Sequence, residues 1–329
     1  MKKYSSIFLN IFIFLLGLFL LYLAFYKHDM SRIWQEIQKV KFRWVFIILL
    51  ISLFNHLTRA ARWQLLTRPL QFPYAVSSLF WALMFGSLVN LAIPRLGEIS
   101  RCLILSRDRE KKHFPALLGT VVSERILDVF CLFLVILLAF YFQYALLFGF
   151  LEEYLLIPLQ KIFLQRQALI FGMFFITVTV ATILWLFRGK ILKSAWLSTL
   201  FQFLIKLKTG IESIAKMPQI AWFLTYTVLI WITYFLMTYL WFFSLPATAH
   251  LSPKEGLALL AIGSIARLAP TQGGGLGAYQ LLVSQGLLLL GIAEIYGATL
   301  AIIIHATQII FILLLGGFAP LYFLLKRKI

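Results

Sequence analysis

A proline and four glycines interrupt an apolar run between residues 263 and 280, and this interruption constrains the fold most strongly. They are Pro270, Gly273, Gly274, Gly275 and Gly277. A helix in lipid cannot easily carry them, because backbone groups freed from the helix find no water there. Residues 257 to 291 are therefore predicted to form two half-helices joined by a turn, with helix resuming over 276 to 291. A kinked helix packed against a neighbour is the alternative.

The predicted turn has the features of an anion site. Backbone N–H groups and the positive end of a half-helix point into it, and Arg267 lies less than one helical turn before Pro270. Broken helices of this kind mark substrate sites in transporters. The candidate substrate-binding residues of this segment are Arg267, Pro270, Gln272, Gly273, Gly274, Gly275 and Gly277.

The rest of the chain reads as a polytopic membrane protein. Hydrophobic residues make up 62% of the 329 residues and charged residues 13%, which excludes an ordinary soluble domain. The net charge of +18 is spread over short loops, so anionic lipid headgroups are the expected partners and nucleic acid is not. Six full spans are predicted, over residues 7 to 26, 44 to 61, 126 to 148, 168 to 187, 219 to 245 and 298 to 325.

Two further apolar segments, 74 to 94 and 257 to 291, are predicted to be re-entrant from opposite sides. With both termini cytoplasmic, this topology places most of the 30 Lys and Arg residues inside. If 74 to 94 were instead a full span, the basic segment 95 to 112 would lie outside. Residues 27 to 43 form an amphipathic interfacial segment, with one face made of Ile33, Trp34, Ile37 and Val40. The opposed elements are typical of inverted repeats.

Two charged clusters lie at the membrane boundary. Arg95, Glu98 and Arg101 follow Pro94 at a spacing of three, so a helix there would carry them as a ladder on one face; a solvated loop is the alternative. In the second cluster, which is expected on a short helix leading into a span, Glu124 and Asp128 share a face and Arg125 can pair with Asp128. This cluster is predicted either to line a polar lipid path or to lock helices together. The candidate residues are Arg95, Glu98, Arg101, Glu124, Arg125 and Asp128.

The final span carries His305 and Gln308 three residues apart, so they are candidates to line a cavity with Gln272 and Gln280. A histidine that serves packing through a hydrogen bond is the alternative. No metal-ligand pattern, cofactor motif or nucleotide-hydrolysing loop is found, and the paired acids have no nucleophile beside them, so no catalytic residue is predicted. The two cysteines, Cys102 and Cys131, indicate no disulfide framework.

Three ordered stretches together resemble the flippase-like transmembrane-domain family, whose members include the transmembrane portion of lysylphosphatidylglycerol synthase. They are Pro94-Arg95-Leu96-Gly97-Glu98 with Arg101, Glu124-Arg125-Ile126-Leu127-Asp128, and Pro270-Thr271-Gln272-Gly273-Gly274-Gly275-Leu276-Gly277. The chain departs from the family in carrying Gln280 where many members place Glu. It ends at Ile329, so the aminoacyl-transfer domain of the two-part synthases is not expected, and neither is lipid aminoacylation.

The resemblance implies an all-α fold with a single transmembrane domain over residues 1 to 329. It also implies a flippase or scramblase for phospholipid-like or lipid-linked anionic substrates, in a bacterial-type plasma (inner) membrane. Two other functions remain open: a non-transporting partner of a lipid-modifying or glycan-assembling enzyme, and an intramembrane lipid transferase. The headgroup, the direction and energy source of transport and the oligomeric state do not follow from the sequence.

Overall fold

All regular secondary structure in the part of the chain that the structure describes is helical. The computed structural model describes residues 15, 19, 21–22, 30–68, 74–106, 114–157, 160, 218–267 and 275–326. It divides into two compact units, residues 1–144 with 218–329, and residues 145–217. In the second unit the described residues continue α7 (Tyr144–Leu151) into the π-helix Glu152–Leu156. The candidate site lies in the first unit.

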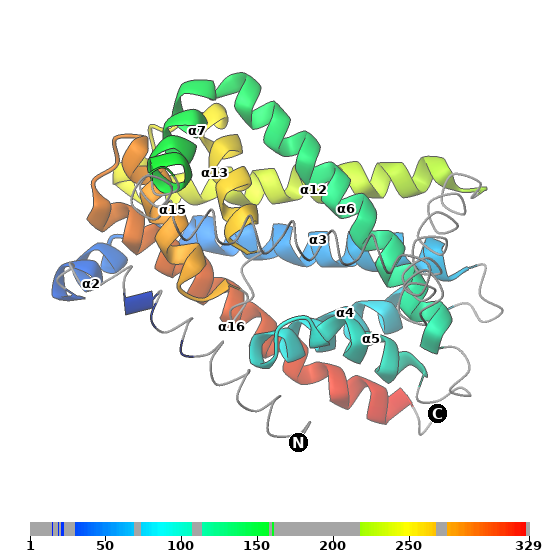
Figure 1. Ribbon diagram of the computed structural model, residues 1–329. Coiled ribbons are helices and arrows are strands. Elements are labelled where there is room, and N and C mark those ends of the chain that lie inside the picture. The colour runs from blue at the N-terminus through cyan, green and yellow to red at the C-terminus, as the bar shows by residue number, and fades with distance from the viewer. Residues whose placement is uncertain are drawn as a thin grey trace, which may run out of the picture. The chain divides into compact units, whose positions relative to one another are not determined.

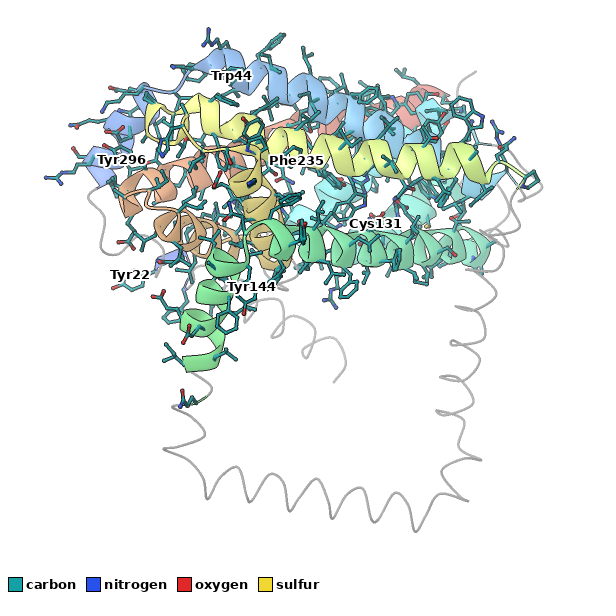
Figure 2. The ribbon with its side chains drawn as sticks, turned by 90° about the horizontal axis from the view of Figure 1, so that it is seen from above. Tyr22, Trp44, Cys131, Tyr144, Phe235 and Tyr296 are labelled. Atoms are coloured by element: carbon teal, nitrogen blue, oxygen red, sulfur yellow. The ribbon has the colours of Figure 1, made fainter. Side chains whose placement is uncertain are left out.

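Within the described ranges, four helices are long and apolar enough to cross a membrane. They are α3 (Phe42–Thr67), α6 (Phe114–Phe142), α12 (Ile220–Trp241, continued by a 3-10 turn to Ser244) and α16 (Glu294–Lys326). Figures 1 and 2 both show α3 and α12 running side by side along the length of the bundle. The protein is therefore an integral membrane protein with an all-helical described fold. The predicted spans 7 to 26 and 168 to 187 lie outside the described residues, apart from four isolated positions in the first.

Helix α6 differs from the prediction of a short helix followed by a span that starts at Ile126. A single helix of 29 residues runs through the charged cluster and ends at Phe142. Pro115 stands at the second residue of the helix, where its missing N–H costs nothing. No proline follows within the helix, and the charged side chains find partners on neighbouring helices. The chain therefore has no physical reason to end the helix at the cluster.

Helices α4 (Val76–Ala92) and α5 (Leu96–Ser106) form an antiparallel hairpin. A Cβ atom on Gly97 would lie 2.1 Å from the carbonyl oxygen of Gly86, so the two backbones touch where these glycines face each other. Asn90 Oδ1 accepts a 2.7 Å hydrogen bond from the Gly97 N–H and holds the turn. The predicted re-entrant element covered residues 74 to 94 alone; the structure adds α5 as its returning helix.

Helices α13 (Pro253–Ala266) and α15 (Ala278–Leu289) are separate, so the predicted interruption of the 257 to 291 segment is confirmed. Their packing is antiparallel and close. A Cβ atom added to Gly263 would lie 3.2 Å from the Tyr279 ring, and one added to Gly286 would lie 2.9 Å from the Ile262 side chain. Residues 268 to 274, at the centre of the predicted turn, lie outside the described residues.

The two hairpins enter the bundle from opposite ends of the long helices (Figure 1). Helix α16 contacts both of them. Near its start Gly297 packs on Ser284 of α15, and further along Gly316 packs on Met84 and Leu88 of α4. The two contacts are about 28 Å apart along the axis of α16. Helix α16 therefore connects the two hairpins.

Helix α2 (Met30–Gln38) corresponds to the predicted amphipathic segment. Ile33 and Val40 are buried and Ile37 packs against the same core, as expected for a shared face. Trp34 is instead 62% exposed, so its assignment to that face is wrong. One residue advances a helix by about 100°, which turns Trp34 away from the face that Ile33 buries.

The start of α13 is fixed by a capping box. Ser252 is the N-cap residue and Pro253 follows it at the first helical position. The carboxylate of Glu255 accepts hydrogen bonds from the Ser252 N–H at 2.7 Å, from the Ser252 hydroxyl and from Gln143 Nε2 at 2.9 Å. Burial raises the pKa of Glu255, but these hydrogen bonds outweigh it and hold the pKa below its usual value.

We therefore expect acid to weaken this end of α13. A carboxylate with a lowered pKa stabilises the fold above its unfolded pKa, near 4.5, and this stabilisation is lost as the pH falls through the folded pKa. Between pH 6 and pH 3 the wild type should lose about 0.5–1 kcal/mol more stability than Glu255→Gln, which has no such charge to lose. Melting temperatures in detergent across this range test the difference. Parallel curves for the two proteins would contradict it.

Candidate functional site

One buried carboxylate, that of Glu124 on α6, holds two arginines from two other helices. Glu124 Oε1 lies 3.1 Å from Arg62 Nη2 on α3, and Glu124 Oε2 lies 2.9 Å from Arg101 Nη2 on α5. Glu124 and Arg62 are fully buried, and Arg101 is nearly so. Charged side chains can be buried this completely only when each is paired with an opposite charge. This contact therefore joins α3, α5 and α6.

Asp128 extends the cluster by one turn of α6. Its Oδ1 lies 2.8 Å from Arg62 Nη2, and its Oδ2 lies 3.9 Å from Arg125 Nη1. Arg125 Nε is also 3.8 Å from Glu98 Oε1 on α5, at the more exposed edge. The predicted pairing of Arg125 with Asp128 is present but loose, and the shorter partner of Asp128 is Arg62. We call Arg62, Glu98, Arg101, Glu124, Arg125 and Asp128 the ion cluster.

Aromatic and hydroxyl groups support the two buried arginines. The Arg101 guanidinium lies 4.5 Å from the ring centroid of Trp63, whose Nε1–H donates to Thr120 Oγ1 at 2.9 Å. Arg62 Nη1 donates to Thr227 Oγ1 on α12 at 3.4 Å. Arg62 Nε and Arg101 Nε and Nη1 have no hydrogen-bond partner among the described residues. The two buried arginines therefore retain N–H donors that could bind a ligand.

The predicted ladder of Arg95, Glu98 and Arg101 does not form. Arg95 precedes α5, in a turn with φ of 66°, and is exposed. Arg101 pairs with Glu124 rather than with Glu98. Glu98 contacts Asn90 Nδ2 at 3.4 Å and Arg125, both outside its own helix. Partners on neighbouring helices replace the ladder because the close α4–α5 packing leaves Arg101 facing α3 and α6.

A cavity of ≈ 240 Å³ lies between α3, α12, α13, α15 and α16. Its α3 wall includes Arg59, three residues before Arg62, so the cavity begins within one helical turn of the ion cluster. Its other walls are mixed aromatic and polar. The lining residues are Ile48, Leu49, Ser52, Asn55, His56, Arg59, Tyr234, Met237, Thr238, Trp241, Leu260, Arg267, Tyr279, Ile304, Thr307, Gln308, Phe311 and Ile312.

The cavity is positively charged. Among the described residues that line it, Arg59 and Arg267 are the two arginines and none carries a carboxylate. The Arg267 guanidinium lies 4.7 Å from the ring centroid of Tyr279, and Arg267 Nη2 donates to Gln308 Oε1 at 3.4 Å. Neither arginine forms an ion pair with a carboxylate in the described part of the chain. An anion is the ligand that this arrangement favours.

Gln280 and His305 do not line this cavity, in contrast to Gln308. Both are buried: Gln280 Oε1 accepts from the Gly277 N–H at 2.8 Å, and Gln280 Nε2 lies 2.6 Å from His305 Nδ1. Gly277 has φ of 79°, which glycine adopts without strain. Gln280 therefore holds the start of α15 and ties it to α16, a positioning task that needs no charge at this residue.

Comparison with known proteins decides the family. The family model described as the lysylphosphatidylglycerol synthase TM region matches residues 7–316. The chain belongs to this family. Searches of the curated proteins and of the solved structures return no match. As a member of the lysylphosphatidylglycerol synthase TM-region family, the protein falls in a class of membrane proteins related to lipid modification or transport.

The family membership gives the three motif stretches a common setting. The first two meet in the ion cluster, through Arg101 and Glu124. Of the third, Gly275 and Gly277 lie in the positive-φ turn before α15, and a Cβ on Gly275 would be 3.5 Å from Arg267 Cα. Pro270, Gln272, Gly273 and Gly274 lie outside the described residues. The end of the third motif therefore lies beside Arg267, which lines the cavity.

The sequence alone did not single out Asn55, His56, Arg59 or Arg62 as candidates. The signal that points to them is their spacing. Asn55, Arg59 and Arg62 recur every three or four residues within α3, which places polar side chains on one strip of an otherwise apolar helix. Such a strip is costly in lipid and therefore faces the bundle interior.

A second hollow is almost wholly apolar. This groove of ≈ 600 Å³ lies between α6, α12 and α13, and Figure 2 labels Cys131 and Phe235 on two of its walls. Lys254, at the start of α13, is the one charged residue in its described lining, and Leu260 lines both the groove and the cavity. Among the described residues, no group of three or more His, Cys, Asp or Glu side chains could hold a metal ion.

Proposed function

We propose that this protein is a flippase or scramblase that moves an anionic phospholipid or lipid-linked anion across the bilayer. The observation that carries the proposal is the cavity whose described lining contains Arg59 and Arg267 and no carboxylate, among helices long and apolar enough to cross the membrane. Ionisable groups at this depth are rare and generally serve transport or binding. The apolar groove beside the cavity suits the hydrocarbon chains of such a substrate.

We further propose six full spans and two re-entrant hairpins, with both termini cytoplasmic, in a plasma membrane. The helices of the two hairpins contain 17, 11, 14 and 12 residues. Their lengths of about 17–26 Å are less than the ~30 Å hydrocarbon core. Entry from opposite ends of the bundle supports re-entrance from opposite sides (Figure 1). The proposed site lies between the hairpins, as in inverted-repeat transporters.

In this proposal the lipid phosphate binds first to Arg267 and Arg59 and then meets the ion cluster. Arg59 and Arg62 lie one helical turn apart on α3, so the positive charges form a continuous strip. The unpartnered donors of Arg62 and Arg101 provide hydrogen bonds for a passing phosphate. Glu124 and Asp128 neutralise these arginines when no phosphate competes for them. Transport is downhill or coupled to an ion gradient.

Transport of a fluorescent anionic lipid in reconstituted vesicles tests the proposal. Arg59→Gln and Arg267→Gln should each lower the translocation rate about 10- to 100-fold, because each removes a charge-assisted hydrogen bond worth about 1.5–3 kcal/mol. The matched control is Arg43→Gln, also on α3, which removes an exposed arginine that does not line the cavity. Its rate should match that of the wild type.

The same experiment separates the other candidate functions. Lipid that appears in the opposite leaflet without chemical change supports the flippase. A covalently altered lipid would support an intramembrane transferase. If the lipid is neither translocated nor chemically altered, the result would support a non-transporting partner of a lipid-modifying enzyme. If Arg59→Gln and Arg267→Gln both translocate lipid at the wild-type rate, the assigned site is wrong even though the protein translocates lipid.

A further inference from the structure

The ion cluster is electrically neutral: its three arginines face three carboxylates, and each arginine is paired with at least one of them. A phosphate that enters the cluster, as proposed above, brings one negative charge for which these six residues hold no unpaired arginine. An unbalanced charge in an apolar interior is costly, and a titratable group there neutralises instead. One of the three carboxylates is therefore expected to take up a proton when the phosphate binds.

Asp128 is the carboxylate that depends most on a single arginine. Arg62 Nη2 lies 2.8 Å from Asp128 Oδ1 and 3.1 Å from Glu124 Oε1, and its hydrogen bond goes to Glu124. Asp128 Oδ1 accepts no hydrogen bond from the described residues, so charge alone holds it there. When a phosphate takes Arg62, Glu124 keeps Arg101 at 2.9 Å. Asp128 is left with Arg125, whose Nη1 is 3.9 Å away on a side chain that is 44% exposed.

The other titratable groups around Asp128 leave it as the proton acceptor. Glu98 is paired with Arg125 and Asn90, neither of which the phosphate takes. The Asp128 side chain is 21% exposed while that of Glu124 is fully buried, so a proton reaches Asp128 more readily. The charged or titratable groups of the helices packed around it are Arg59 and Arg62 on α3, Glu98 and Arg101 on α5, Glu124, Arg125 and Cys131 on α6, and Lys254, Glu255 and Arg267 at the two ends of α13, while α12 presents the Thr227 hydroxyl.

We propose that Asp128 takes up one proton when the phosphate of an anionic lipid displaces it from Arg62, and releases that proton when the ion pair re-forms. This inference rests on the proposed function and names the ion to which transport is coupled. The carboxylate becomes a neutral acid as the phosphate takes over its arginine, so the charge of the cluster stays the same. Lipid and proton are bound together, and one proton therefore crosses with each lipid without net movement of charge.

Binding of phosphatidylmethanol to the protein in detergent tests the inference, because the single charge of this phosphodiester lipid does not change between about pH 6 and pH 8. Calorimetry in two buffers of different ionisation enthalpy counts the protons taken up. The wild type should take up about one proton per lipid, and its affinity should rise by up to about 10-fold for each pH unit lowered. Asp128→Asn removes the competitor of the phosphate, so it should bind more tightly at pH 8 and take up no proton.

Two variants serve as matched controls. His56→Gln removes a titratable group that lines the cavity near Arg59, and Glu98→Gln removes the other partly exposed carboxylate of the cluster. Both should keep the proton uptake, and its loss in either would assign the proton to that residue and overturn the inference. So would a folded Asp128→Asn protein that no longer binds the lipid. If Asp128→Asn does not fold, the proton count of the wild type and of the two controls decides.

Transport in vesicles with a pH gradient separates this inference from the proposed function. The wild type should concentrate labelled phosphatidylmethanol in the leaflet that faces the alkaline side, by up to about 10-fold per pH unit, and protein-free vesicles should not. Translocation that ignores the gradient overturns the inference and leaves the proposed function standing. Proton uptake on binding without translocation supports the exchange at Asp128 and overturns the proposed function. If the lipid is neither bound nor moved, both are overturned.

Discussion

Glu124→Gln is expected to lower the free energy of unfolding by about 3–5 kcal/mol, the cost of breaking a buried ion pair from one side. The substitution preserves size and removes the charge that holds Arg62 and Arg101. Of these two arginines Asp128 pairs with Arg62 alone, so Arg101 keeps no carboxylate partner among the described residues. Denaturant unfolding in detergent micelles measures the change. Translocation should fall as well, because the two arginines are no longer held in register.

Glu98→Gln is the matched control for this prediction. It removes a carboxylate from the same cluster, but one that is 28% exposed and lies 3.8 Å from its nearest arginine atom. Such a partly solvated pair contributes less than about 1 kcal/mol. Equal losses for the two variants would mean that the cluster acts only through its total charge. No loss for Glu124→Gln would refute the buried pairing.

Gly97→Ala is expected to open the α4–α5 hairpin. The added methyl group would lie 2.1 Å from the Gly86 carbonyl oxygen and 2.5 Å from the Asn90 side chain. The first of these is backbone and cannot rotate aside, so the helices must separate, at a cost of at least about 1–3 kcal/mol. A lower melting temperature measures the effect. Loss of the Arg101 contact with Glu124 should accompany it and reduce transport.

Gly119→Ala on α6 controls for the added methyl group itself. A Cβ there would meet no atom within 4 Å, so this variant should be neutral or stabilised by up to about 1 kcal/mol through helix propensity. If Gly97→Ala melts like Gly119→Ala, the close backbone contact between α4 and α5 is absent.

The break in the last hairpin was predictable because its cause is local. Glycine and proline act on their own backbone, so the sequence alone places an interruption between 263 and 280. The acid pair of α6 was found for the same reason, since residues four apart share a helix face. The role of Glu124 in holding two arginines was not predicted.

The pairings of the site depend on how helices pack, which no local pattern contains. Glu124 is 62 residues from Arg62 and 23 from Arg101. Spacing rules rank partners on the same helix and therefore gave the ladder of Arg95, Glu98 and Arg101. The contact of Gly86 with Gly97 turns α5 back against α4 and presents Arg101 to Glu124 instead. The cavity arises in the same way, from five helices at once.

One carboxylate that serves two arginines on separate helices also constrains how this family can evolve. A lineage that replaces the acid at the position of Glu124 by a neutral residue would leave Arg62 and Arg101 without their shared partner in an apolar interior. At least one of the two arginines should therefore be substituted in the same lineage. Loss of a single base leaves the acid with its other partner and is tolerated more readily. Aligned relatives should therefore show asymmetric covariation among these three columns, with the acid changing last.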